Sequence, residues 1–180
     1  MYKKRDIHHL IENIDTSFSL ALHTHDYVGS GCARNVFRLD ENYVVKISRD
    51  TVVDYATVEG DAYAGGIHQS LKEIEVYKNT PMGLRYLINP IIDRGIYNGH
   101  VYIVQEYVEV EGSLDDGYCT YSEYAQSFGY DKEEIDERVN DIREMCDYFG
   151  LSYDDILEFS ANIGHHPQRG VVIVDYGYPD

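Results

Sequence analysis

The first residues of the chain that suit phosphate chemistry are a glycine-bearing segment and a lysine that follows it. Gly29, Ser30 and Gly31 stand together, and glycines without a Cβ allow main-chain amides to approach a phosphate group closely. Lys46 lies among alternating apolar residues in the segment Tyr43 to Ile47, so its ammonium group leaves that expected strand on one fixed face. The alternative interpretation is an ordinary hairpin turn followed by a solvent-exposed strand lysine.

A glutamate on a predicted helix is placed to complete this arrangement. Apolar residues between Ile67 and Tyr77 recur every three or four positions, which predicts a helix that ends before Pro81. Glu73 lies on this helix, 27 residues after Lys46. We therefore expect the carboxylate of Glu73 to pair with the ammonium group of Lys46.

The glycine-rich loop, the strand lysine and the helix glutamate, in this order, resemble a protein-kinase-like fold. The segment Tyr102 to Val108 is similar to the kinase strand that runs into the connection between two lobes, with Gln105 at the gatekeeper position. The resemblance implies that ATP is the cofactor and that its adenine bonds to main-chain groups of Glu106 and Val108. It covers the chain from Gly29 to Gly177, and its motifs are most similar to those of small kinase-like proteins carried by bacteriophages.

Two further residues are similar to the metal ligands of that family. Asn162 resembles the catalytic-loop asparagine, and Asp175 resembles the DFG-type aspartate, with Tyr176 in place of phenylalanine. The asparagine and the aspartate are 13 positions apart, close to the family's spacing. The resemblance implies that one oxygen ligand from each holds a Mg²⁺ ion against nucleotide phosphates.

The residue expected to orient the acceptor hydroxyl departs from the family pattern. Its usual position, five residues before Asn162, is occupied by Leu157, and a leucine side chain accepts no proton. Asp155 lies seven residues before Asn162, and a bulge in the chain would bring its carboxylate to the same place. Glu158 is a second substitute, and spacing alone leaves both open. We take Asp155 as the expected catalytic base, beside Lys46 and Glu73.

Two other departures bear on function. Arg34 replaces the third glycine of the nucleotide loop, and the His-Arg-Asp signature is absent. The sequence stops at Asp180, soon after the expected metal aspartate. We therefore expect the family's activation segment and peptide-docking platform to be missing.

The local patterns predict a sheet-forming half followed by a helical half. A short amphipathic helix is expected over Tyr2 to Asp15. The expected strands are Phe18 to Leu22, Asn35 to Leu39, Tyr43 to Ile47, Leu87 to Asp93, His100 to Val110 and Val171 to Val174. An Asn-Gly pair, Asn98 with Gly99, predicts a tight hairpin between two of them.

Sequence patterns also predict two connections and the last long helix. Asp50 to Gly66 is predicted as a loop, and Glu111 to Gly117 as a hinge between lobes. The strongest helix is expected from Asp131 to Phe149, with Asp131 as its N-terminal cap and Gly150 after its C-terminus.

Composition narrows the classes of partner. The chain has 32 acidic against 15 basic residues and a formal net charge of -17, which disfavours direct binding to nucleic acid, because such binding requires clustered Lys and Arg. No apolar run approaches the roughly 20 residues that span a bilayer, so we expect no membrane partner and a soluble, cytoplasmic protein. Three cysteines without a CxxC pair are expected to be reduced thiols.

These observations predict an α+β, reduced two-lobed protein-kinase-like fold. We expect an N-terminal helix over residues 1–16, an N-lobe of antiparallel sheet plus helix over 17–108, and a truncated helical C-lobe over 109–180. Two functions remain open. One is an ATP-dependent phosphotransferase acting on a protein hydroxyl, encoded by a phage and acting in the host cytoplasm. The other is a catalytically degenerate, acidic, tyrosine-rich pseudokinase that binds and inhibits a host protein, with a nucleic-acid-binding protein as one candidate target.

Overall fold

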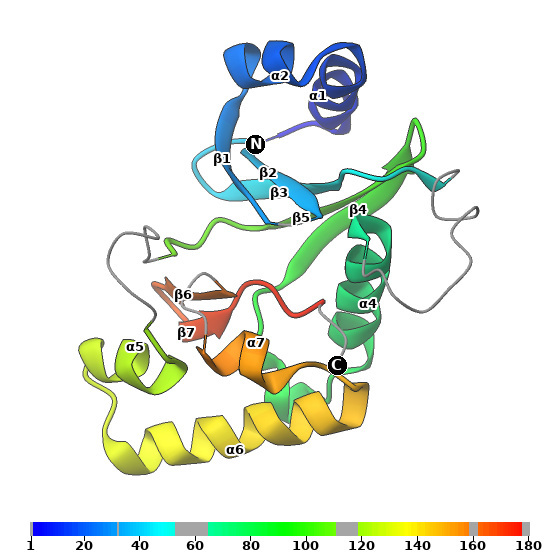
Figure 1. Cartoon of the computed structure of the whole chain (residues 1–180). Helices are drawn as coiled ribbons and strands as arrows, with labels where there is room; N and C mark the ends of the chain where they lie inside the picture. Colours follow the sequence, from blue (N-terminus) through cyan, green and yellow to red (C-terminus); the bar gives the residue numbers. More distant parts are fainter. Residues whose placement is uncertain (1, 32, 53–64, 111–118, 159–161, 178–180) are drawn as a thin grey trace. The chain divides into compact units, whose positions relative to one another are not determined.

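The computed structural model of the chain describes residues 2–31, 33–52, 65–110, 119–158 and 162–177. These residues form a mixed α and β fold that contains a five-stranded antiparallel sheet, a two-stranded sheet and several helices (Figure 1). The chain divides into two compact units. The first comprises Met1–Leu71 and Ile91–Tyr107, and the second Lys72–Pro90 and Val108–Asp180. Residues 72–90 therefore pack with the second unit, although the sequence-based division places them in the N-lobe.

The five-stranded sheet belongs to the first unit. In spatial order its strands are β1 (Asp26–Ser30), β2 (Arg34–Arg38), β3 (Tyr43–Ser48), β5 (His100–Glu106) and β4 (Ile91–Tyr97). Every neighbouring pair is antiparallel. The tight hairpin predicted between β4 and β5 is present, with φ of 48° at Asn98 and 84° at Gly99, the positive values that a two-residue hairpin turn of this kind requires.

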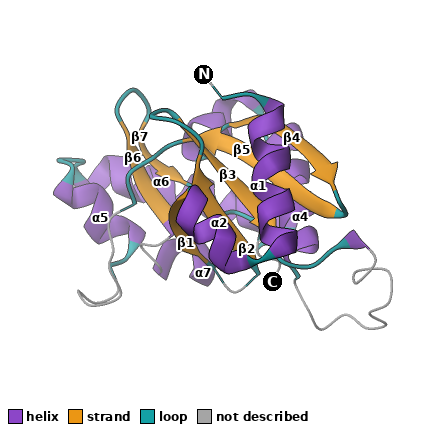
Figure 2. Cartoon of the chain, turned by 90° about the horizontal axis from the view of Figure 1, so that it is seen from above, coloured by secondary structure: helices purple, strands orange, loops and turns teal. Residues whose placement is uncertain are grey.

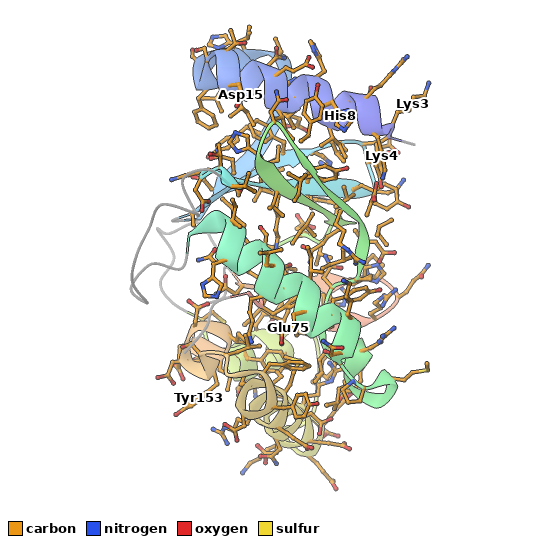
Figure 3. The ribbon with its side chains drawn as sticks, turned by 90° about the vertical axis from the view of Figure 1, so that its right-hand side faces the viewer. Lys3, Lys4, His8, Asp15, Glu75 and Tyr153 are labelled. Atoms are coloured by element: carbon orange, nitrogen blue, oxygen red, sulfur yellow. The ribbon has the colours of Figure 1, made fainter. Side chains whose placement is uncertain are left out.

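Helix α1 (Lys4–Thr16) covers one face of this sheet (Figures 1 and 2). Ile7, Leu10 and Ile11 are buried in one cluster with sheet residues that include Phe37, Val45, Ile47, Tyr102 and Val104. Polar contacts hold both ends of the helix, where Figure 3 labels Lys4 and Asp15. Lys4 Nζ lies 3.3 Å from Asp93 Oδ1, and Asp15 Oδ1 lies 2.9 Å from His100 Nε2. The expected N-terminal helix is thus an integral layer of the first unit.

The segment after α1 corrects a prediction. Phe18 to Leu22 is expected as a strand because apolar residues alternate, but the structure has the helix α2 (Phe18–Thr24) there. Ala21 is its one buried residue and joins the core beneath α1, while Leu20 and Leu22 remain 40% and 41% exposed. Alternation predicts a strand only where a sheet covers one of its faces, and here a helix buries a single small residue instead.

The start of β4 is also later than expected. The strand predicted over Leu87 to Asp93 begins at Ile91, and Met82–Leu87 form the 3-10 helix η1. Pro90 lies between them, and it has no N–H group for a strand ladder. The following strand, expected to reach Val110, ends at Glu106.

The second unit is mostly helical. Its elements are the later part of α4 (Gly66–Asn79), η1, α5 (Tyr121–Ser127), α6 (Lys132–Phe149), α7 (Tyr153–Glu158), β6 (Ile163–His166) and β7 (Gly170–Ile173). The helix predicted from Asp131 to Phe149 is confirmed as α6. Asp131 Oδ1 accepts a hydrogen bond of 2.9 Å from the Glu134 amide, and Gly150 has φ of 61°.

Two expected connections fall outside the described residues: the hinge Glu111 to Gly117 entirely, and the loop Asp50 to Gly66 over positions 53–64. In the described part of the chain, none of the helices combines the length and the apolar character needed to cross a lipid bilayer.

Candidate functional site

Three polar residues predicted for chemistry lie close together in the second unit. Asp155 is on α7, Asn162 stands directly before β6, and Asp175 follows β7 by two residues. The side-chain amide of Asn162 donates to the main-chain oxygen of Asp155 at 2.9 Å and to its carboxylate Oδ2 at 3.0 Å. Asn162 therefore fixes both the backbone and the side chain of Asp155.

The electrostatics of this cluster disfavour a second negative charge. Burial raises the pKa of the Asp155 carboxyl, and the nearby charge of Asp175 raises it further. Two carboxylates held this close repel each other, and a bound cation would relieve the repulsion. Because both hydrogen bonds from the Asn162 side chain to Asp155 use Nδ2, its Oδ1 is the atom that it can offer to such a cation.

The donor set fits a hard cation. Carboxylate and amide oxygens are the ligands that Mg²⁺ and Ca²⁺ prefer, whereas zinc sites are usually built from Cys and His. Among the described residues, no three Asp, Glu, His or Cys side chains gather into a metal-binding group. A cation here would therefore be held by few protein ligands and would depend on phosphate oxygens or water for the rest, as Mg²⁺ commonly does.

The backbone around Asp175 is held by hydrogen bonds from both sides of the hairpin. Ile163 pairs with Ile173 in the antiparallel β6 and β7 ladder. Directly beyond it, the Val174 amide donates to the Asn162 carbonyl at 2.8 Å. This bond ties the residue before Asp175 to the residue whose side chain holds Asp155.

Leu157, at the position where the family pattern expects an aspartate, is part of the hydrophobic core. It is 7% exposed and belongs to the apolar cluster of the second unit. Successive helical residues are about 100° apart, so Asp155 and Leu157 point to nearly opposite sides of α7. The side that carries Asp155 contacts Asn162, while Glu158, the other candidate base, is exposed.

The glycine-rich segment forms a hairpin in the first unit. Gly29 and Ser30 are in β1 and pair with Val36 and Asn35 of β2. Neither Gly29 nor Gly31 has a positive φ, and a Cβ added to either would meet no described atom within 4 Å. The fold of the described residues therefore gives no reason for glycine at these two positions.

Lys46 lies on the face of the sheet away from α1. Val45 and Ile47 pack in the cluster beneath that helix, and strand side chains alternate, so Lys46 points to the other face. The residue is 6% exposed. Glu106, the last residue of β5, pairs with Tyr43 at the opposite end of β3 from the glycine hairpin.

The remaining predicted site residues lie in the second unit. Glu73 is fully buried in α4, and Val108 is 7% exposed. The expected ion pair between Lys46 and Glu73 joins residues of different units and stays a prediction. Val108 packs against Gly164, where any Cβ would collide with its Cγ1 atom.

Asn89 supports the strand that leads to the site, although no sequence pattern predicts this role. The Asn89 amide donates to the Ile173 carbonyl at 2.9 Å, and the preceding Ile88 forms a parallel bridge with Ile173. These contacts support the end of β7 that leads to Asp175. A single asparagine before a proline suggests only a turn, so no local pattern could have identified this role.

Comparisons with known proteins give distant structural likenesses. No family model matches the chain, and no curated protein matches its sequence. The chain is similar to a crystal structure of WbdD with the kinase inhibitor LY294002, with 15% identity and a TM-score of 0.46 over 84% of this chain and 32% of that one. It is also similar to monomeric WbdD, with 18% identity and a TM-score of 0.47 over 81% of this chain and 32% of that one. The chain thus spans about a third of the length of these proteins.

Proposed function

We propose that this chain is a kinase-like phosphotransferase that uses ATP and Mg²⁺ to phosphorylate a protein hydroxyl. The observation that carries the proposal is the group of Asp155, Asn162 and Asp175, in which one amide positions a carboxylate of raised pKa beside a second carboxylate. A structural role alone does not account for two neighbouring carboxylates, because their repulsion costs stability.

In this proposal Asp155 is the base. Its raised pKa makes it a better proton acceptor than an ordinary aspartate. The oxygen of the acceptor hydroxyl forms a bond to the γ-phosphorus, the bond from that phosphorus to the bridging oxygen breaks, and ADP leaves with the electron pair. The hydroxyl proton passes to the Asp155 carboxylate, which Asn162 holds in place.

Asn162 and Asp175 would hold the Mg²⁺ ion, which supplies positive charge against the phosphate oxygens. Gly29, Ser30 and Gly31 would let main-chain amides approach the phosphates, which gives the glycines a reason that the protein's own packing does not. Lys46 would neutralise phosphate charge, and Glu73 would hold Lys46 in place.

Two measurements test the proposal. Thermal unfolding should shift upward with ATP and Mg²⁺ together, and much less with ATP and a chelator, because a ligand that binds only the folded state stabilises it. Intact-mass spectrometry after incubation with ATP and candidate host proteins should then detect an added phosphoryl group. Asp175→Ala is the control that should lose both signals. Absence of any nucleotide-dependent shift in the wild-type protein would refute the proposal.

A second candidate function is supported by Leu157. Its side chain is built into the core, so the usual catalytic aspartate is replaced by a structural residue. With a net charge of -17, the chain would then be an acidic pseudokinase that occupies a basic host protein. Nucleotide binding without phosphate transfer to any acceptor would favour this candidate over the first.

A further inference from the structure

The residue that follows Asp175 makes a hydrogen bond that phenylalanine could not make. Tyr176 is fully buried, and its hydroxyl donates to the main-chain oxygen of Asn89 at 2.8 Å. Burying a hydroxyl without a partner is costly, so a tyrosine is tolerated at this site because the Asn89 carbonyl accepts a hydrogen bond from it. The ring fills the core, and the hydroxyl adds a directional bond.

Asp175 is therefore fixed from both sides along the chain. On one side, the Val174 amide is bonded to the Asn162 carbonyl at 2.8 Å. On the other, the hydroxyl of Tyr176 is bonded to Asn89. The main-chain amide of Asn89 also donates a hydrogen bond of 2.9 Å to the carbonyl of Ile173, the last residue of β7.

Asn89 therefore forms hydrogen bonds to the chain on both sides of Asp175. Asn89 contacts the chain both two residues before Asp175, through its amide, and one residue after it, through its carbonyl. A rotation of the main chain at Asp175 would have to break the Tyr176 bond or distort the end of β7. The main chain at Asp175 is thus held in one conformation by the protein itself.

We infer that Tyr176 is a positioning residue, whose hydroxyl fixes the Asp175 carboxylate for Mg²⁺. The inference rests on the proposed function, since it takes Asp175 as a metal ligand. Mg²⁺ demands near-ideal octahedral geometry, whereas Ca²⁺ accepts flexible and irregular coordination. Loosening Asp175 should therefore weaken Mg²⁺ binding more than Ca²⁺ binding, and this difference separates positioning from a loss of general stability.

The test compares Tyr176→Phe with the matched control Tyr121→Phe. Tyr121 is also buried in the core of the second unit, at 1% exposure, but its hydroxyl meets Arg138 Nη1 at 3.4 Å, on a different element. The readout is the metal concentration that gives half of the ATP-dependent shift in unfolding temperature, measured separately with Mg²⁺ and Ca²⁺. We expect Tyr176→Phe to raise the Mg²⁺ value about 10-fold, the usual scale for losing a residue that orients a metal ligand. The Ca²⁺ value should change less than about 3-fold.

Three results would overturn the inference. Tyr176→Phe could keep the wild-type Mg²⁺ value, it could weaken both metals equally, or Tyr121→Phe could raise the Mg²⁺ value as much. Replacement of Tyr176 by 4-aminophenylalanine retains an N–H donor and should restore the wild-type Mg²⁺ value. It decides the question even if Tyr176→Phe does not fold, because failure of that rescue contradicts the inference. A wild-type protein with no metal-dependent shift would instead refute the proposed function itself.

Discussion

Replacing Asp155 with asparagine should make the protein more stable and, at the same time, much less active in phosphate transfer. The substitution removes a carboxyl group whose pKa is raised by burial and by the charge of Asp175. It keeps a side-chain oxygen that can accept the hydrogen bond from the side-chain amide of Asn162. The second bond from that amide, 2.9 Å to the main-chain oxygen of residue 155, does not depend on the side chain. The local structure should therefore persist in Asp155→Asn.

The expected gain follows from the pKa of Asp155. A raise of one pKa unit corresponds to about 1.4 kcal/mol for a fully developed effect. Asp155 is only half-buried, so solvent screens part of this energy, and a neutral oxygen accepts a somewhat weaker hydrogen bond than a carboxylate. We expect a net gain of about 0.5 kcal/mol, which raises the unfolding temperature of a domain of this size by about 1 to 2 °C.

The gain should depend on pH in one direction. Because the folded pKa lies above the unfolded value of about 3.9, the protonated wild-type carboxyl contributes its full stability at lower pH. That contribution is lost as the pH rises through the folded pKa. Asp155→Asn carries no such charge, so the two proteins should be closest near pH 4 and should separate toward neutral pH.

The assay is thermal unfolding in the presence of a chelator, from pH 4 to pH 7.5, with Asp154→Asn as the control. Asp154 is the exposed neighbour on the same turn of α7, and its substitution should leave stability the same or slightly lower. Phosphate transfer by Asp155→Asn should fall by roughly 10² or more, the scale for losing a positioned base. A destabilised Asp155→Asn protein at neutral pH would refute the electrostatic reasoning, and full activity would refute the role as base.

Three further changes test other parts of the site. Gly31→Ala should leave the free energy of unfolding unchanged or raise it by about 0.5 kcal/mol, since a Cβ at this position meets no described atom, yet it should weaken ATP binding. Gly66→Ala is the control, because a Cβ there would collide with a main-chain oxygen, and it should lower the free energy of unfolding by about 1 to 3 kcal/mol. An equal loss of stability in both variants would contradict the open space at Gly31. Asp175→Ala should remove Mg²⁺-dependent ATP binding without unfolding the protein, as seen by calorimetry and circular dichroism, and an unchanged affinity would contradict the metal assignment. Lys46→Met and Glu73→Gln should be non-additive in unfolding free energy by about 1 kcal/mol or more if the two charges pair, whereas strict additivity would exclude the pair.

Short-range patterns in the sequence determined those elements that depend on few neighbours. The hairpin at Asn98 and Gly99 follows from the positive φ that this turn requires, and α6 follows from an apolar repeat between the cap Asp131 and Gly150. The candidate ligands Asn162 and Asp175 could also be identified, because their residue types and spacing resemble a family pattern. Each of these signals lies within a few residues of what it specifies, or in a motif of fixed order.

Tertiary structure alone decided the features that depend on distant partners. The alternating residues of Phe18 to Leu22 form a helix because α1 covers Ala21, a contact that no local pattern contains. Sequence spacing alone did not decide between Asp155, the expected base, and Glu158. The rotation of α7 directs Asp155 to Asn162 and Leu157 into the core. Asn89 acquires its role through main-chain bonds to residues more than 80 positions away. Main-chain groups are the same in every residue, so their partners depend on how the chain folds and leave no mark in the sequence.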